Sequence, residues 1–129
     1  MKAASTITRK AEEGVKLEWA KCKAAIENNF LKPISNFVLF NSNHIDRRDA
    51  QGYTLLCLAV HYGRVEMVDI LLKNGASPTV QTLESDGKNT PLHIAVNFKF
   101  KKIQDLLIEA GADENVPNAK GLTPWEGLS

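Results

Sequence analysis

The sequence has little excess charge of either sign and no long hydrophobic run. Its 129 residues carry 16 Lys and Arg against 15 Asp and Glu, a formal net charge of +1. This balance provides no general attraction to nucleic acid or anionic lipid. No apolar run approaches the roughly 20 residues of a membrane-spanning helix, and the charged N-terminus lacks the apolar core of a secretory signal. We therefore expect a cytoplasmic protein that binds neither nucleic acid nor membrane.

Motifs of catalysis and metal binding are also missing. The sequence contains no GxGxxG, GxxxxGK(S/T), HExxH or GxSxG pattern and no EF-hand loop. The cysteines Cys22 and Cys57 belong to no CxxC pair, so we expect small buried hydrophobic residues rather than a disulfide, metal site or nucleophile. The histidines His44, His61 and His93 fall on different predicted elements. These absences predict a protein that is not an enzyme and that uses no cofactor or metal.

What the sequence does contain is an internal repeat. The segment GYTLLCLAVHYGRVEMVDILLKNGASP, from Gly52, recurs as KNTPLHIAVNFKFKKIQDLLIEAGADE, from Lys88. The next copy, GLTPWE, begins near the C-terminus, and the period is 33 residues with three extra residues in one connection. A diverged copy begins upstream at Ala25. Self-similarity at such a period is typical of repeat proteins.

Each copy predicts a pair of helices. Three equivalent alanines are each followed, sixteen residues later, by Asn41, Gly75 or Gly111. Asn and Gly tolerate the left-handed conformation that ends a helix. In the second copy, Gly63 separates a short apolar stripe from a second stripe at helical spacing, which is formed by Val65, Val68, Leu71 and Leu72. Two helices of about ten residues cannot bury their apolar faces alone, so we expect the pairs to stack.

Three segments resemble a known family. TPLHIA at residues 90–95, GRVEMVDILLKNGASP and LLIEAGADEN are similar to the ankyrin repeat, and the resemblance covers roughly residues 17–129. It implies an all-α solenoid of stacked helix-loop-helix units with short β-hairpin-like fingers. The implied units are about 17–50, 51–86, 87–119 and a partial 120–129, in a domain at 13–129 that follows a frayed segment at 1–12. It also implies a structural role for His93, which caps a helix start together with Thr90.

The third unit departs from the family pattern at its inter-helix turn. Lys99 occupies the place of the usual Gly, Lys101 that of a Leu, and Gln104 that of a Val. One interpretation is that Phe98 and Phe100 fill core space that Lys101 and Gln104 leave empty. The aromatic and lysine residues could instead form a patch for a protein, or a stacking patch for nucleic acid. Three lysines fall short of the six to ten phosphate contacts of tight binders, which disfavours nucleic acid.

Both ends of a repeat array must cover apolar surface. At the front we predict a helix from Glu13 to Asn28 whose apolar face contains Leu17, Ala20, Ala24 and Ala25, with Trp19 and Cys22 adding to it. At the back, Trp125 stands where the family has Leu. Trp125 either folds over the third unit as a small cap, or it belongs to an apolar face left open for a partner.

The resemblance implies that another protein binds the concave surface made by the finger tips and the inner helices. Its variable contact positions correspond to Gln51, Tyr53, His61, Tyr62, Asn89, Asn97, Phe98, Lys120 and Leu122. The first finger adds Arg47 and Arg48, and the second, which contains the insertion, adds Leu83. We therefore predict a non-catalytic protein-protein interaction module. The alternative is a subunit or capping element of a homo- or hetero-oligomer, which docks or self-associates through the C-terminal face near Trp125.

Overall fold

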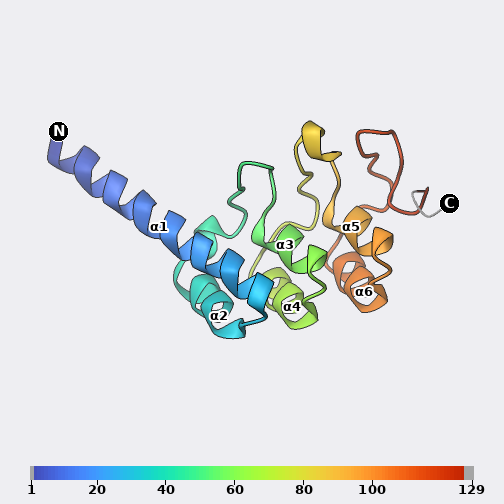
Figure 1. The fold of residues 1–129 in the computed structure, drawn as a ribbon, viewed down its shortest axis with the longest axis horizontal. Coiled ribbons are helices and arrows are strands. Elements are labelled where there is room, and N and C mark those ends of the chain that lie inside the picture. The colour runs from blue at the N-terminus through green and yellow to red at the C-terminus, as the bar shows by residue number, and fades with distance from the viewer. Residues whose placement is uncertain (1, 127–129) are drawn as a thin grey trace.

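Within the described residues, three helix pairs stack one after another (Figure 1). The computed structural model describes residues 2–126, with side chains from residue 12 onward. The pairs are α1 (Lys2–Asn28) with α2 (Leu31–Phe40), α3 (Leu55–His61) with α4 (Val65–Lys73), and α5 (Pro91–Asn97) with α6 (Lys101–Glu109). No strand occurs between residues 2 and 126. The predicted all-α architecture of stacked pairs is confirmed.

The helices form two parallel rows. The inner helices α1, α3 and α5 contact one another in that order, and the outer helices α2, α4 and α6 form a second row behind them. The connections between pairs rise on one side as fingers (Figure 1). We call them finger 1 (residues 42–54, with the 3-10 turn η1, Ser42–His44), finger 2 (residues 76–90, with η2, Glu84–Asp86) and finger 3 (residues 112–123).

Two inner helices begin at threonines, as the repeat predicts. The hydroxyl of Thr54 accepts a hydrogen bond from the backbone N–H of Cys57 at 3.2 Å. Thr90 caps α5 in the same way through His93, whose ring accepts the backbone N–H of Thr90 at 3.1 Å. Pro91 occupies the first turn, where its missing N–H costs nothing. These caps fix where each inner helix starts and therefore how it meets its finger.

The buried face of α1 differs from the predicted one. Leu17 is 58% exposed, and Ala20 and Ala24 are exposed too. Trp19 and Cys22, expected only to add to this face, are buried in the core against α2 and α3. Both stripes have helical spacing, but the side with the indole buries more apolar area than the side with two alanines. The helix also begins at Lys2 rather than at Glu13. The boundary at residue 12 stays a prediction.

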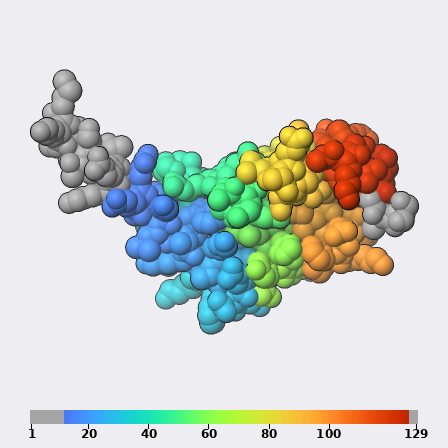
Figure 2. Space-filling view, turned by 45° about the horizontal axis from the view of Figure 1, so that its top comes forward, coloured from blue at the N-terminus to red at the C-terminus, as the bar shows by residue number. Residues whose placement is uncertain are grey.

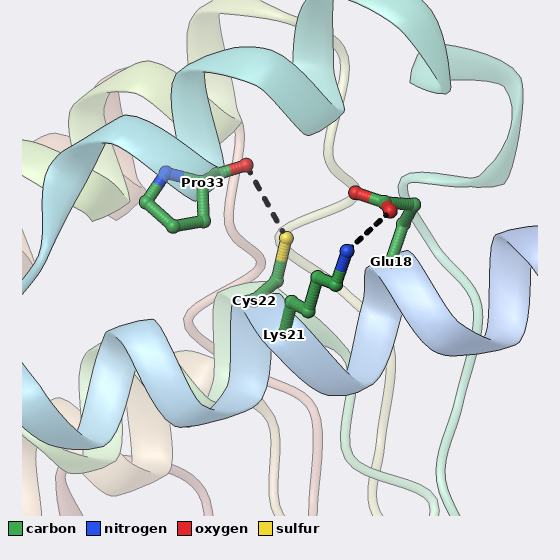
Figure 3. A network of polar contacts seen from close by, with 4 residues as sticks. All are labelled: Glu18, Lys21, Cys22 and Pro33. Carbon is green, nitrogen blue, oxygen red and sulfur yellow. Dashed lines mark hydrogen bonds and ion pairs between the residues drawn. The ribbon is translucent and has the colours of Figure 1, made fainter.

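The contact between α1 and α2 includes a buried thiol (Figure 3). Cys22 Sγ donates to the carbonyl oxygen of Pro33 at 3.5 Å. Next to Cys22 on α1, Lys21 Nζ lies 3.1 Å from Glu18 Oε1, a partly exposed ion pair that contributes little to stability. Burial, with a smaller contribution from Glu18, raises the pKa of Cys22 to about 12. The buried environment of this thiol agrees with the structural role predicted for both cysteines, which are free.

The turn between the helices of each pair contains a residue in the left-handed region. Asn29, Gly63 and Lys99 occupy the same register and have φ values of 60°, 69° and 62°. Gly63 adopts this conformation without strain, whereas a lysine there costs about 1–2 kcal/mol. Lys99 therefore occupies a glycine position of the repeat, as its place in the sequence predicts.

The ends of the outer helices are less uniform than predicted. Gly75 and Gly111 have φ values of 95° and 99°, in the left-handed region expected of them. Asn41 has φ −132° and ψ 30°, so the expectation of a left-handed residue after α2 is wrong. The chain enters η1 directly after Asn41, and the backbone N–H of Asn41 bonds to the carbonyl oxygen of Phe37 at 2.7 Å. A helical turn follows immediately, so no reversal of the backbone is needed there.

In the third unit, the interpretation that Phe98 and Phe100 fill core space left empty by Lys101 and Gln104 is wrong for Phe98 and Gln104. Gln104 leaves no space in the core, because it is buried and its Nε2 donates to the carbonyl oxygen of Ala95 at 3.4 Å. Phe98 is 44% exposed and fills no core space. Only Phe100 packs inward, with its ring directly against Gly63 of the preceding unit. Phe98 is therefore available at the surface.

Candidate functional site

The three fingers are tied to one another by main-chain hydrogen bonds. Between fingers 1 and 2, the backbone N–H of Leu83 donates to the carbonyl oxygen of Gln51 at 3.1 Å. Between fingers 2 and 3, the N–H of Ala119 donates to the carbonyl oxygen of Gly87 at 2.9 Å. In the space-filling view the fingers form one continuous surface from green through yellow to red (Figure 2). The finger side of the molecule is thus held in a defined shape.

A hollow of about 380 Å³ lies between fingers 2 and 3 and the inner helix α5. We call it the α5 hollow. It brings together seven predicted contact residues from three units: Tyr53, His61, Asn89, Asn97, Phe98, Lys120 and Leu122. The sequence places these residues up to 69 positions apart, and only the stacking of the units makes them neighbours.

A second hollow, of about 300 Å³, lies one unit earlier, between α1, α3 and finger 1. We call it the α3 hollow. It is lined by two further predicted residues, Gln51 and Tyr62, and it shares Tyr53 and His61 with the α5 hollow. These two shared residues therefore form the wall between the hollows.

Aromatic rings make a continuous row along the ends of the inner helices. The ring of His61 meets Tyr62 and Phe98 edge-on, each with 5.2 Å between centroids. Phe98 stacks on Phe100 at 5.6 Å. We call Tyr62, His61, Phe98 and Phe100 the ring row. Three of its members are exposed. Ring contacts of this kind fix side chains in place before binding and lower the entropy lost on association.

Tyr53 is held between two fingers. Its backbone N–H donates to Asp49 Oδ1 at 2.9 Å, and Tyr53 lines the α5 hollow together with Asp86 of finger 2. Burial raises the pKa of Tyr53, and the neighbouring carboxylate of Asp86 raises it further. The phenol of Tyr53 therefore stays neutral at physiological pH. The side chain forms a fixed part of the wall, with a polar hydroxyl group at its tip.

Asparagine side chains shape the far wall of the α5 hollow. Asn118 Oδ1 accepts the backbone N–H groups of Lys120 and Leu122 at 2.9 and 3.1 Å. Asn118 Nδ2 donates to Asn89 Oδ1 at 3.2 Å. These bonds form finger 3 and join it to finger 2. They set the positions of Lys120 and Leu122 at the edge of the hollow.

Three predicted residues lie outside these two hollows. Arg48 donates from Nε to the carbonyl oxygen of Gly52 at 3.2 Å and from its terminal nitrogen to that of Gln81, so it ties finger 1 to finger 2. Leu83 on finger 2 is 42% exposed and lines a third hollow together with Arg48 of finger 1. Arg47 is half-buried and does not line any of these three hollows. Arg48 thus has a structural task in addition to any contact it makes.

Sequence reasoning missed several residues that line the hollows. Glu27 lines the α3 hollow and occupies the register of His61 and Asn97, so the repeat itself could have found it. Asp86 lies on the inserted turn η2, to which no other unit corresponds. Asn118 acts through hydrogen bonds to other segments. Asp86 carried no signal in the repeat pattern. Asn118 shares its register with Asp49, and each accepts two backbone N–H groups of its own finger.

The C-terminal part of the described chain folds back on finger 3. The indole Nε1 of Trp125 donates to Glu114 Oε1 at 3.1 Å, and the side chain is 37% exposed. Pro124, next to it, is buried and lines the α5 hollow. Trp125 is thus attached to finger 3 by a polar contact and still presents part of its ring, and both expectations for it stay predictions.

Two further features concern metal binding and the membrane. Among the described residues, no group of three or more His, Cys, Asp or Glu side chains is arranged to hold a metal ion. None of the described helices is long and apolar enough to cross a membrane.

Comparison with known proteins identifies the fold. The family described as ankyrin repeats (3 copies) matches residues 22–118. The chain is 30% identical over 105 residues to human Rabankyrin-5, covering 73% of this chain and 9% of that protein. It is 32% identical over 103 residues to the putative ankyrin repeat protein FPV014 of fowlpox virus, covering 79% of this chain and 23% of that one. The chain therefore belongs to the ankyrin-repeat family.

A further relative is an ion channel. The potassium channel KOR2 of rice is 37% identical over 78 residues, which cover 60% of this chain and 10% of the channel. The chain thus spans less than a quarter of the length of each of these relatives. What they share with it is the repeat, and ankyrin repeats generally serve as protein-protein interaction modules.

Proposed function

We propose that this chain is a non-catalytic module that binds another protein through the two hollows and the ring row. The observation that carries the proposal is the α5 hollow, which gathers predicted contact residues from three units around exposed aromatic rings. Aromatic anchors at the centre of a polar rim are the usual composition of a protein interface. The hydrogen-bonded fingers support it, because a preorganised surface loses little conformational entropy on binding.

The cytoplasm is the compartment that we propose for this binding. Both cysteines are free and buried. Small proteins of oxidising compartments usually use their cysteines in disulfides. The chain also has a stacked core that needs no covalent link.

An affinity capture with surface variants tests the proposal. The binding variant combines His61→Ala, Tyr62→Ala and Phe98→Ala, three exposed residues whose truncation leaves the core intact. Tyr53 is left unchanged because it is partly buried against the core. The matched control combines Lys32→Ala, Glu66→Ala and Lys73→Ala, which are exposed on the outer helices. Circular dichroism checks that both variants fold.

A partner that the control retains and the binding variant loses supports the proposal. A partner that both variants retain contradicts the concave-surface assignment. In that case the alternative, docking through the C-terminal face, is tested by Trp125→Ala, since the indole presents part of its ring. Sedimentation equilibrium separates the two, because only the alternative expects a stable complex without a foreign partner.

A further inference from the structure

The α5 hollow and the α3 hollow are the same feature in successive units. His61 and Asn97 occupy one register of the repeat, and Tyr62 and Phe98 the next. His61 and Tyr62 line the α3 hollow, and their counterparts Asn97 and Phe98 line the α5 hollow. The hollows are therefore offset by one inner helix, and packed helices lie about 8–10 Å apart. A single bound segment of about that reach meets both.

The α5 hollow has an apolar part bordered by asparagine side chains, and its charge is balanced. Its walls include Ile94, Phe98 and Leu122, and it contains one carboxylate, Asp86, and one ammonium group, Lys120. Tyr53 lines the hollow together with this carboxylate. An apolar side chain of a partner gains contacts with Ile94, Phe98 and Leu122 here, while Lys120 is exposed to solvent.

The α3 hollow has a different character. Two carboxylates, Glu27 and Asp49, stand against one ammonium group, Lys23. The rings of Tyr53 and Tyr62 add aromatic surface. Carboxylates beside aromatic faces suit a guanidinium or an ammonium group.

The helix end beside the α3 hollow already binds one guanidinium, so the preference for a partner's cation rests on the two carboxylates. Glu27 lies in the last turn of α1, and His61 is the last residue of α3. The C-terminal end of a helix carries partial negative charge on its free carbonyl groups. Arg64 provides the bound guanidinium, because its Nε and terminal nitrogen donate to the carbonyl oxygens of Ile26 and Glu27 at 2.8 and 2.9 Å. The same guanidinium lies 6.0 Å from the Tyr62 ring centre.

We infer that the partner presents two anchors about 10 Å apart, one apolar side chain for the α5 hollow and one Arg or Lys for the α3 hollow. This inference rests on the proposed function and specifies the chemistry of the partner. The wall of Tyr53 and His61 lies between the anchors. In a polyproline II segment, residues three apart share a face and lie about 9 Å apart. In a helix, residues seven apart lie about 10.5 Å apart on one face.

The test begins with a phage-displayed library of random peptides, selected on the whole chain. A peptide length of about twelve residues spans both hollows in either conformation. Enriched peptides are synthesised with a fluorophore, and their dissociation constants are measured by fluorescence anisotropy. We expect an apolar and a basic residue at a spacing of three or seven.

Charge variants then assign the basic anchor. Glu27→Lys should weaken binding of an enriched peptide about fivefold, and Lys23→Glu should strengthen it by a similar factor. A lysine at position 27 is favourable at a helix C-terminus, so this variant folds. Glu66→Lys on α4 is the matched control with an unchanged dissociation constant. Phe98→Ala should weaken binding through the apolar anchor.

The outcomes separate this inference from the proposed function. Peptides with the two anchors, opposite effects at positions 23 and 27, and a loss with Phe98→Ala support it. A second outcome would be peptides whose binding Phe98→Ala weakens but which carry acidic residues, or whose dissociation constant Glu27→Lys leaves unchanged. This outcome overturns the basic anchor but leaves the proposed binding site in place. Peptides indifferent to all these variants overturn both. A failure to enrich any peptide overturns the inference, because the library contains both anchors at every spacing, and leaves the capture of a folded partner to decide the proposed function.

Discussion

The ring of His93 joins its own helix start to a finger 29 residues further along the chain. Its Nε2 lies 2.8 Å from the carbonyl oxygen of Leu122. Its Nδ1 accepts the backbone N–H of Thr90 at 3.1 Å, so the neutral ring carries its hydrogen on Nε2 and donates it to Leu122. The edge of the α5 hollow at Leu122 therefore depends on a buried imidazole of α5.

Replacing His93 by alanine should lower the free energy of unfolding by about 1–3 kcal/mol, because the substitution removes a buried polar side chain that makes hydrogen bonds on both sides. Urea denaturation followed by circular dichroism measures the change. His44→Ala, in finger 1, is the matched control and should change stability by no more than about 0.5 kcal/mol. Equal effects of the two substitutions would contradict the structural assignment of His93.

Arg64 should be a stabilising residue that lysine replaces poorly. Its two donors reach neighbouring carbonyl oxygens at the end of α1, a geometry that the planar guanidinium provides and a single ammonium group does not. We expect Arg64→Ala to cost about 1–3 kcal/mol and Arg64→Lys to recover less than half of the loss. Thermal and urea unfolding measure both. Arg47→Ala serves as the control arginine, and a larger loss there than at Arg64 would refute this prediction.

The inter-helix turns offer a pair of substitutions with opposite signs. Gly63→Ala should destabilise the protein by at least about 1–2 kcal/mol, since position 63 has φ 69° and its new Cβ would stand 3.0 Å from the Phe100 ring. Lys99→Gly, at φ 62°, should instead stabilise it by about 0.5 kcal/mol, because relief of backbone strain outweighs the added flexibility. Differential scanning calorimetry compares the two. A destabilising Lys99→Gly would show that the lysine side chain contributes packing that outweighs the strain.

The ionisation and the reactivity of the two cysteine thiols should change when the chain unfolds. Burial raises the pKa of Cys22 to about 12 and also raises that of Cys57. Unfolded thiols ionise near their ordinary pKa of 9.0. Above that pH the unfolded state has lost protons that the folded state keeps, so the free energy of unfolding falls as pH rises from 9 towards 12.

Two measurements check this. A thiol reagent such as DTNB should react slowly with the folded chain at pH 8 and rapidly in urea. In denaturant titrations at pH 7 and 10, Cys22→Ala should show a smaller fall in stability than the unchanged chain. Rapid labelling of the folded protein would contradict the buried placement of both thiols.

Local patterns in the sequence predicted those parts of the molecule that depend on local physics. The caps at Thr54 and Thr90 follow from side chains that bond to a backbone group three residues away. The face of α1 depends instead on which stripe α2 and α3 cover, and two stripes of helical spacing compete for it. The one with Trp19 wins because burying an indole removes more apolar area from water.

The candidate site shows the same division. Tyr53, His61 and Phe98 were found because the repeat register identifies inner-helix and finger positions. Asp86 was missed because the inserted turn has no equivalent in other units, and hydrogen bonds within finger 2 place it in the wall of the hollow. Arg48 stays a predicted contact residue, and nothing in the sequence indicated its structural task, in which the guanidinium bonds to main-chain carbonyls of its own and the next finger.

The main-chain bonds from Leu83 to Gln51 and from Ala119 to Gly87 have a consequence for how the molecule opens. They couple neighbouring units at the finger side as the packed helices do on the other side, so no finger can detach without disturbing the next. In a linear array with such nearest-neighbour coupling, opening starts at an end and proceeds inwards. The amide hydrogens of Leu83 and Ala119 should therefore exchange with solvent in sequence, with that of Leu83, nearer the middle, protected for longer.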